Sequence, residues 1–140
     1  MLEQIRQAKA AGARGIVTGA VTRAGQVDVE RTAELIAAAR PLGVTFHRAI
    51  DASTSITAAP GTLIELGADR VLTSGGAKTA ALGAKTIGRL VMQAAGRIAI
   101  LAGGGIDASN AARIVQETGV QEIHFSVKTA QKVRDVLESL

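Results

Sequence analysis

A repeating pattern of glycine-ended helices and β-branched segments constrains the fold of this 140-residue chain more than any other feature. In each repeat an apolar helical stretch closes at a glycine, and a short run rich in Val, Ile or Thr follows. The closing glycines are Gly12, Gly43, Gly67, Gly96 and Gly119. Their spacing leaves room for one strand, one helix and short loops, so each repeat predicts one β/α unit.

This spacing places the expected elements along the chain. We predict helices over residues 2–11, 29–41, 56–66, 79–95, 108–118 and 129–139. We predict strands over residues 15–21, 44–50, 70–74, 98–102 and 122–127. The whole chain, residues 1–140, is therefore expected to form a single α/β domain of five parallel strands and about six helices.

Local signals support several of these boundaries. Asp28, Asp107 and Thr129 stand where a side-chain oxygen would cap the following helix. Pro60 favours a late start for the third helix, at that residue. The segments AGARGIVTGA (11–20) and LGADRVLTSG (66–75) align with each other and predict equivalent strands, each delivering a threonine to its carboxyl end.

Composition narrows the possible functions. Apolar residues make up 47% of the chain but aromatics only 1%, so Ala, Val, Ile and Leu must form the core. The basic excess is spread over helices without a basic run, which argues against a nucleic-acid partner. No apolar run approaches a membrane span, no cysteine is present, and the amino terminus lacks a signal-peptide layout. We expect a cytoplasmic protein without a membrane partner.

The segment VTFHRAID (44–51) holds the first candidate site. His47, Arg48 and Asp51 follow an apolar run, and they are candidate catalytic residues because imidazole exchanges protons near neutral pH. Strand alternation would put His47 on the face opposite Phe46 and Arg48. Asp51 would orient Arg48 or His47, or would merely begin the next loop.

The segment QEIHFSV (121–127) contains the second histidine, His124. Alternation would place Glu122, His124 and Ser126 on one face, toward the interior or mouth of the sheet. His47 and His124 are the only histidines, which makes them the candidate metal ligands. The alternative is that each forms a structural hydrogen bond.

Two glycine-rich turns are candidate anion-binding sites. In LAGGGID the amides of Gly103, Gly104 and Gly105 would approach a phosphate or carboxylate before a helix start. In TSGGAKT the donors would come from Thr73, Ser74 and Gly75. Ser126 would add a hydroxyl, and tight turns without a ligand are the alternative.

Three long segments together resemble the CutC copper homeostasis family: GIVTGAVTRAGQVDVERTAELIAAARPLGVTFHRAID, GADRVLTSGG and AGGGIDASNAARIVQETGVQEIHFS. The resemblance implies a cytoplasmic TIM barrel linked to copper tolerance, and it makes copper the implied cofactor. It also implies that His47, Arg48 and Asp51, with the Thr73–Gly75 and Gly103–Gly105 turns, line the carboxyl face of the barrel. Copper(I) prefers sulfur, however, and only Met1 and Met92 carry it here.

The chain resembles only part of that barrel, since it begins before the family's fourth strand. Five strands in barrel order would leave an apolar inner face and two sheet edges uncovered. Either copies of the chain associate as a homo-oligomer, most simply a dimer, or the strands rearrange into an open flavodoxin-like sheet with helices on both faces.

Three functions stay open at this point. The first is a CutC-like fragment with weak metal or anion binding at the carboxyl rim. The second is a lyase- or isomerase-like enzyme for a small phosphorylated or carboxylated substrate. In that enzyme Gly103–Gly105 would hold the anion, His47 would move a proton and Arg48 would clamp a carboxylate. The third is an engineered folding scaffold without activity.

Overall fold

The computed structural model describes all residues, 1–140, and has five strands and six α-helices. The elements are α1 (Leu2–Ala10), β1 (Gly15–Thr18), α2 (Val29–Ala39), β2 (Gly43–Phe46), the 3-10 helix η1 (Arg48–Ala52), α3 (Ala59–Leu66), β3 (Arg70–Thr73), α4 (Ala84–Ala94), β4 (Ala99–Gly103), α5 (Ala111–Thr118), β5 (Glu122–His124) and α6 (Ala130–Ser139). Strand and helix alternate throughout, as the glycine spacing predicts.

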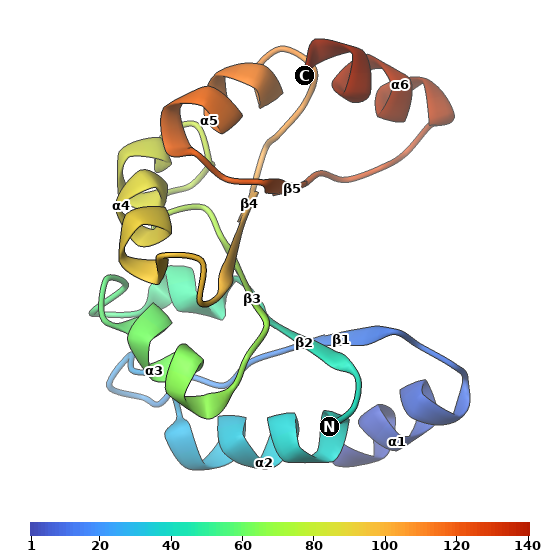
Figure 1. Ribbon diagram of the computed structural model, residues 1–140, viewed down its shortest axis with the longest axis vertical. Helices are drawn as coiled ribbons and strands as arrows, with labels where there is room; N and C mark the ends of the chain where they lie inside the picture. The colour runs from blue at the N-terminus through green and yellow to red at the C-terminus, as the bar shows by residue number, and fades with distance from the viewer.

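The five strands form one parallel sheet in the order β1-β2-β3-β4-β5. Each strand pairs with the next in sequence, and the helices lie in an arc around the sheet (Figure 1). This order is that of a partial (β/α) barrel, which confirms the predicted fold class. The flavodoxin-like alternative is wrong, because that topology would place β1 between two other strands.

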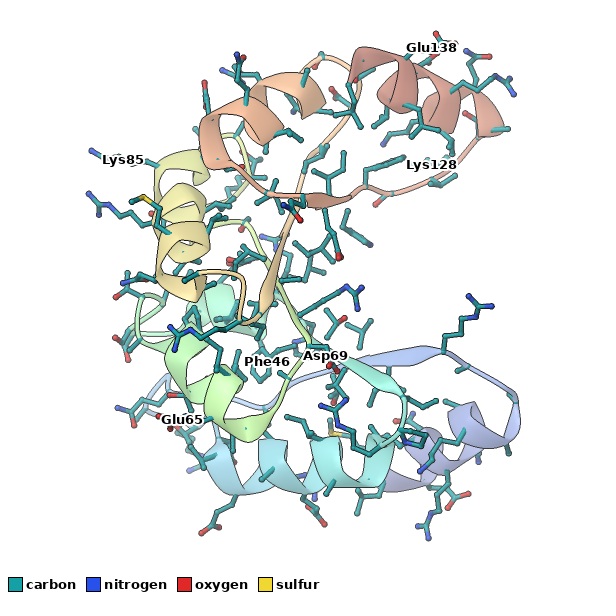
Figure 2. The ribbon with its side chains drawn as sticks, viewed as in Figure 1. Phe46, Glu65, Asp69, Lys85, Lys128 and Glu138 are labelled. Carbon is teal, nitrogen blue, oxygen red and sulfur yellow. The ribbon has the colours of Figure 1, made fainter.

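The core lies between the sheet and its helices. Val44, Phe46 and Val71 are buried on the helix-facing side of the strands, against fully buried leucines and isoleucines of the helices. The largest of these are Leu35, Leu63, Ile87, Leu90 and Ile114. Charged residues such as Lys85 and Glu138 point away from the fold in Figure 2. Small aliphatic side chains thus supply nearly all of the packing, as the composition indicates.

Three strands, β1, β2 and β5, end several residues before their predicted carboxyl ends. The segments 15–21 and 44–50 stop being strand after Thr18 and Phe46, and segment 122–127 stops after His124. The reason at β2 is local, because His47 Nδ1 accepts the amide of Ala49 and caps η1. Strand alternation therefore does not extend to Arg48, and its predicted placement on the Phe46 face is wrong.

The structure confirms two of the three predicted helix caps. Asp28 and Thr129 each accept an amide hydrogen from the first turn of the next helix, as predicted. The predicted cap at Asp107 is wrong, since α5 begins at Ala111 after Asn110. The Asp107 carboxylate instead accepts the amide and hydroxyl of Ser109 and closes a turn. The third helix begins at Ala59, with Pro60 in its first turn, close to the predicted late start.

The sheet side opposite the helices, here called the inner face, carries the strand residues that the core leaves accessible. Val17 is 64% exposed, and Arg70 Nε pairs with Glu122 Oε2 at 2.7 Å across the intervening β4. The sequence predicts an apolar inner face, and this prediction is only partly right, because the Arg70–Glu122 ion pair lies on that face. None of the helices is long and apolar enough to cross a bilayer.

Candidate functional site

The predicted site residues gather at the carboxyl end of the sheet. Thr73, Gly103 and His124 are the last residues of β3, β4 and β5, and His47 directly follows β2. Because all five strands are parallel, these ends share one edge of the sheet, the carboxyl rim. The rim is where folds of this type place ligands.

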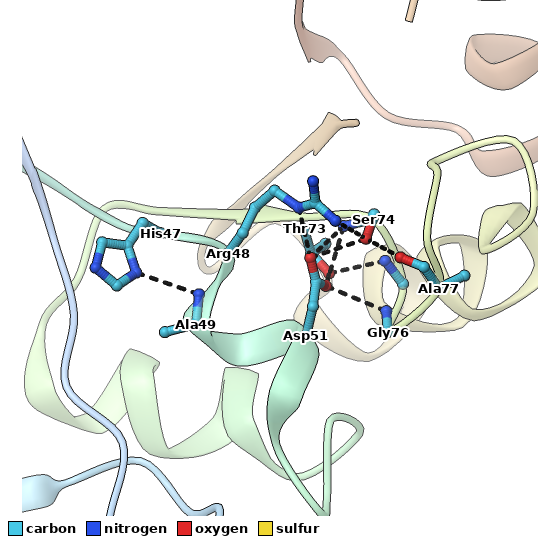
Figure 3. A network of polar contacts seen from close by, with 9 residues as sticks. His47, Arg48, Ala49, Asp51, Thr73, Ser74, Gly76 and Ala77 are labelled. Carbon is cyan, nitrogen blue, oxygen red and sulfur yellow. Dashed lines mark hydrogen bonds and ion pairs between the residues drawn. The ribbon is translucent and has the colours of Figure 1, made fainter. Parts of the chain in front are cut away.

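Asp51, in η1, is the centre of the hydrogen-bond network at the rim (Figure 3). Its Oδ1 accepts from Thr73 Oγ1 at 2.5 Å and from the amide of Gly76 at 3.1 Å. Its Oδ2 accepts from Arg48 Nε and from Ser74 Oγ, both at 2.8 Å. The Ser74 amide reaches both oxygens, at 3.0 and 3.1 Å. The carboxylate ties η1 to the turn after β3.

The pKa of Asp51 reflects two opposing effects. Burial by itself would raise the pKa, but hydrogen bonds from Thr73, Arg48 and the amides of Gly76 and Ser74 outweigh it. The net result is a pKa below the ordinary value of an aspartate. Asp51 is therefore a carboxylate at neutral pH.

The turn Thr73–Gly76 already holds an anion, and that anion is Asp51. Thr73 and the amides of Ser74 and Gly76 donate to the carboxylate, while the Gly75 amide donates to Thr73 Oγ1 at 2.9 Å. An external anion at the predicted Thr73, Ser74 and Gly75 site would have to displace this side chain. The donors of the second glycine-rich turn are not engaged in this way.

Arg48 extends from the Asp51 network toward that second turn. Its Nε and Nη2 are engaged by Asp51 and by Ser74 Oγ, the latter at 2.7 Å. Its Nη1 lies 3.2 Å from the point where a Cβ of residue 104 would stand. Gly104 has φ +113°, a conformation that L residues rarely adopt, so only glycine admits the guanidinium so close to the loop.

A pocket of about 250 Å³ opens beside this guanidinium, between the ends of β4 and β5 and the start of α6. We call it the rim pocket. Its polar lining residues are Arg48, Gly104, Gly105, His124, Ser126 and Lys132. The loop and turn hydrogen bonds use neither the Gly104 nor the Gly105 amide as a donor. The structure therefore brings Arg48, the glycine loop, His124 and Ser126 together.

His47 is not part of this group. Its ring lies on the far side of Ala49 from the Arg48–Asp51 pair (Figure 3), where Nδ1 accepts the Ala49 amide at 3.2 Å. It lines a different pocket, with residues of α1 and β1. His47 is therefore a neighbour of Arg48 and Asp51 in sequence, but its ring does not join their hydrogen-bond network.

The residues present do not fit a copper site. No three His, Cys, Asp or Glu side chains lie together in a way that could hold a metal ion. His47 and His124 line separate pockets, and the sulfur-bearing Met1 and Met92 are 50% and 81% exposed. A metal shared by the two histidines stays a prediction without support from this geometry.

Lys132 is the site residue that sequence reasoning missed. It lies in the first turn of α6, and it lines the rim pocket. It also lowers the pKa of Asp107 through its charge, after the larger effect of the Ser109 hydrogen bonds. Its position in the first turn of the helix that follows the last strand could have indicated that it lies near the carboxyl rim.

Comparison with known proteins decides the family. The profile of the CutC family matches residues 1–129. The chain belongs to the CutC family. It is 46% identical over 132 residues to a family protein CutC of Bacteroides thetaiotaomicron, covering 94% of this chain and 53% of the relative. A CutC protein of Pasteurella multocida is 48% identical over 128 residues, covering 91% and 52%. The chain thus spans about half the length of these curated CutC relatives.

Solved structures agree with the family. A putative copper homeostasis protein CutC from Streptococcus agalactiae superposes with a TM-score of 0.83 at 32% identity, covering 88% of this chain and 60% of that one. A protein described as an aldolase superposes with a TM-score of 0.70 at 20% identity, covering 87% and 58%. The second likeness shows the shared barrel-type fold and nothing about chemistry.

Proposed function

We propose that this CutC-family chain binds a small anion in the rim pocket. The observation that carries the proposal is Arg48, which Asp51 and Ser74 hold with Nη1 against the Gly104 turn. A guanidinium fixed by two partners loses little side-chain freedom on meeting a ligand, which favours binding. The unengaged loop amides supply further donors.

The charges around the pocket also support an anion. Arg48 and Lys132 contribute two cations to the lining, and no carboxylate is part of it. Asp51 lies behind Arg48, where five donor groups engage its oxygens. Its negative charge is compensated there, so it does not close the pocket to a second anion.

A titration with inorganic phosphate tests the proposal. A ligand at ten times its Kd stabilises the folded chain by about 1.4 kcal/mol, which raises Tm by about 4 °C for a chain of this size. We expect that rise for the wild type and its loss in Arg48→Met. Arg89→Met on α4 is the matched control, because it removes an exposed arginine outside the pocket. Equal Tm rises in wild type and Arg48→Met would refute the proposal.

One observation supports the alternative function, a lyase or isomerase reaction. A histidine, His124, lies in the same pocket as the anion-binding groups, whereas the predicted proton carrier, His47, does not. An enzyme of this class would therefore use His124. Turnover of a small phosphorylated or carboxylated carbonyl compound, lost in His124→Gln, is the measurement.

We further propose that two copies of this 140-residue chain associate through their inner faces. Val17 is 64% exposed there, and Arg70 and Glu122 neutralise each other, so a second copy would meet little charge repulsion. Strands β1 and β5 also have only one neighbour each. Light scattering should give the mass of a dimer for the wild type and of a monomer for Val17→Lys. Val29→Lys, on α2, should remain a dimer, and a monomeric wild type would refute this proposal.

A cytoplasmic location stays part of the proposal, on the basis of family membership. Cell fractionation with an antibody against the chain is the measurement, and recovery in the membrane pellet would contradict it.

A further inference from the structure

The rim pocket contains one group to which the proposed anion binding assigns no role, His124. It is the last residue of β5 and pairs in register with Gly103 of β4. Gly103 has no side chain, and a Cβ there would lie 3.5 Å from His124 Nδ1. The imidazole is exposed, and none of the side-chain hydrogen bonds or ion pairs involves it, in contrast to His47. Both of its nitrogens are therefore available to a ligand.

The number of donors around the pocket distinguishes between classes of anion. The pocket is lined by six residues that carry hydrogen-bond donors: Arg48, Gly104, Gly105, His124, Ser126 and Lys132. A carboxylate offers about four lone-pair sites on two oxygens. A phosphoryl group offers three terminal oxygens and close to two negative charges. The lining has more donors than a carboxylate can accept, and enough for a phosphoryl group.

The charge and the volume of the pocket also favour a phosphoryl group over a carboxylate. Two permanent cations, Arg48 and Lys132, match a dianion better than a monoanion. Lys132 is also near Asp107, whose carboxylate is held by Ser109, so that cation is only partly compensated. A volume of about 250 Å³ holds a phosphoryl group with a short carbon fragment, but it is below the size of typical drug-sized sites.

We propose that the rim pocket takes a phosphate monoester and that His124 donates a hydrogen bond to its phosphoryl oxygens. This inference rests on the proposed anion binding and names its ligand class. His124 closes the β5 side of the pocket, opposite Arg48 on the η1 side. Together they would hold the phosphoryl group over the Gly104–Gly105 turn.

Ligand binding followed by NMR at fixed pH 7 tests the proposal, with methyl phosphate as the probe and acetate at equal ionic strength for comparison. The chain has two histidines, so their ring signals are easily assigned. We expect methyl phosphate to shift the His124 signals and to bind at least about tenfold more tightly than acetate. Loss of a hydrogen bond to a charged group costs about tenfold in affinity, the expected effect of His124→Gln. Lys128→Gln, nearby but outside the pocket lining, should change affinity less than twofold.

The outcomes separate this inference from the proposed function. If methyl phosphate raises Tm in an Arg48-dependent manner but leaves the His124 signals and the His124→Gln affinity unchanged, His124 has no such role and the inference fails alone. Acetate binding as tightly as methyl phosphate would refute the phosphate class. If neither anion raises Tm, anion binding itself fails, and this inference fails with it.

Discussion

Replacing Asp51 by asparagine tests the central physical claim about the rim, which is that a buried carboxylate joins η1 to the β3 turn. The Asp51 side chain is only 11% exposed, and it accepts hydrogen bonds from Arg48, Thr73, Ser74 and Gly76. In Asp51→Asn one acceptor oxygen becomes an NH2 group that faces other donors. Every remaining bond also loses its charge assistance.

The expected cost follows from these contacts. Hydrogen bonds to a charged group contribute about 1.5–3 kcal/mol against about 1 for neutral pairs, and an unsatisfied buried donor costs about 1–3 kcal/mol. Because the Arg48 side chain is 41% exposed, the ion pair itself adds little. We expect Asp51→Asn to lower the free energy of unfolding by about 3 kcal/mol, a large share of the 5–15 kcal/mol typical of a domain.

Urea unfolding followed by circular dichroism measures the difference, and its pH dependence gives a second test. The pKa of Asp51 is lowered in the folded chain, so its ionisation stabilises the fold above the unfolded value, about 3.9, and this contribution is lost as pH falls through the folded pKa. The gap between wild type and Asp51→Asn should be full at pH 7 and should narrow below about pH 4. The exposed control Asp135→Asn should stay within about 0.5 kcal/mol of wild type. A gap below 0.5 kcal/mol at pH 7, or one that widens in acid, would refute the reasoning.

Four further substitutions have definite expected outcomes. Thr73→Val removes a fully buried hydroxyl that donates to Asp51 and accepts from Gly75, so calorimetric unfolding should show a loss of about 2 kcal/mol. Gly104→Ala combines φ +113° with a Cβ 3.2 Å from Arg48 Nη1, and should both destabilise by about 1–3 kcal/mol and weaken phosphate binding in calorimetry. Gly61→Ala, in α3 with open space around its Cβ, should instead stabilise by about 0.5–1 kcal/mol. Leu35→Ala, at 0% exposure, should lower the urea midpoint by the equivalent of about 2–5 kcal/mol.

The architecture was predictable because its signal repeats. Gly67 and Gly119 each end a helix in a left-handed conformation, and a strand follows within a few residues. Gly43, predicted to close the second helix, is instead the first residue of β2, because α2 ends at Ala39. Because this pattern of helix, glycine and strand recurs along the chain, it predicts parallel strands joined by helices. Strand order was not predictable from it, because the same elements also suit a flavodoxin-like sheet, and the choice depends on which strands pair.

The site was predictable only in its position along the chain. The strand ends place Arg48, the Gly103–Gly105 loop and Ser126 at one rim, as expected from parallel strands. Which side chains meet there depends on tertiary contacts between residues 22 or more positions apart, such as Asp51 with Thr73. His47 leaves the group for a local reason, since it caps η1 with its own ring.

The pairing of every strand with its predecessor in the chain bears on how this protein acquires its structure. Forming each strand pair closes only one loop of modest length, so the entropy cost of assembling the sheet is spread over small steps. Growth can start at β3 and β4, which pair over four residues in the middle of the sheet, and spread outward in both directions. Damage at an outer strand would then fray that end first and leave the middle ordered.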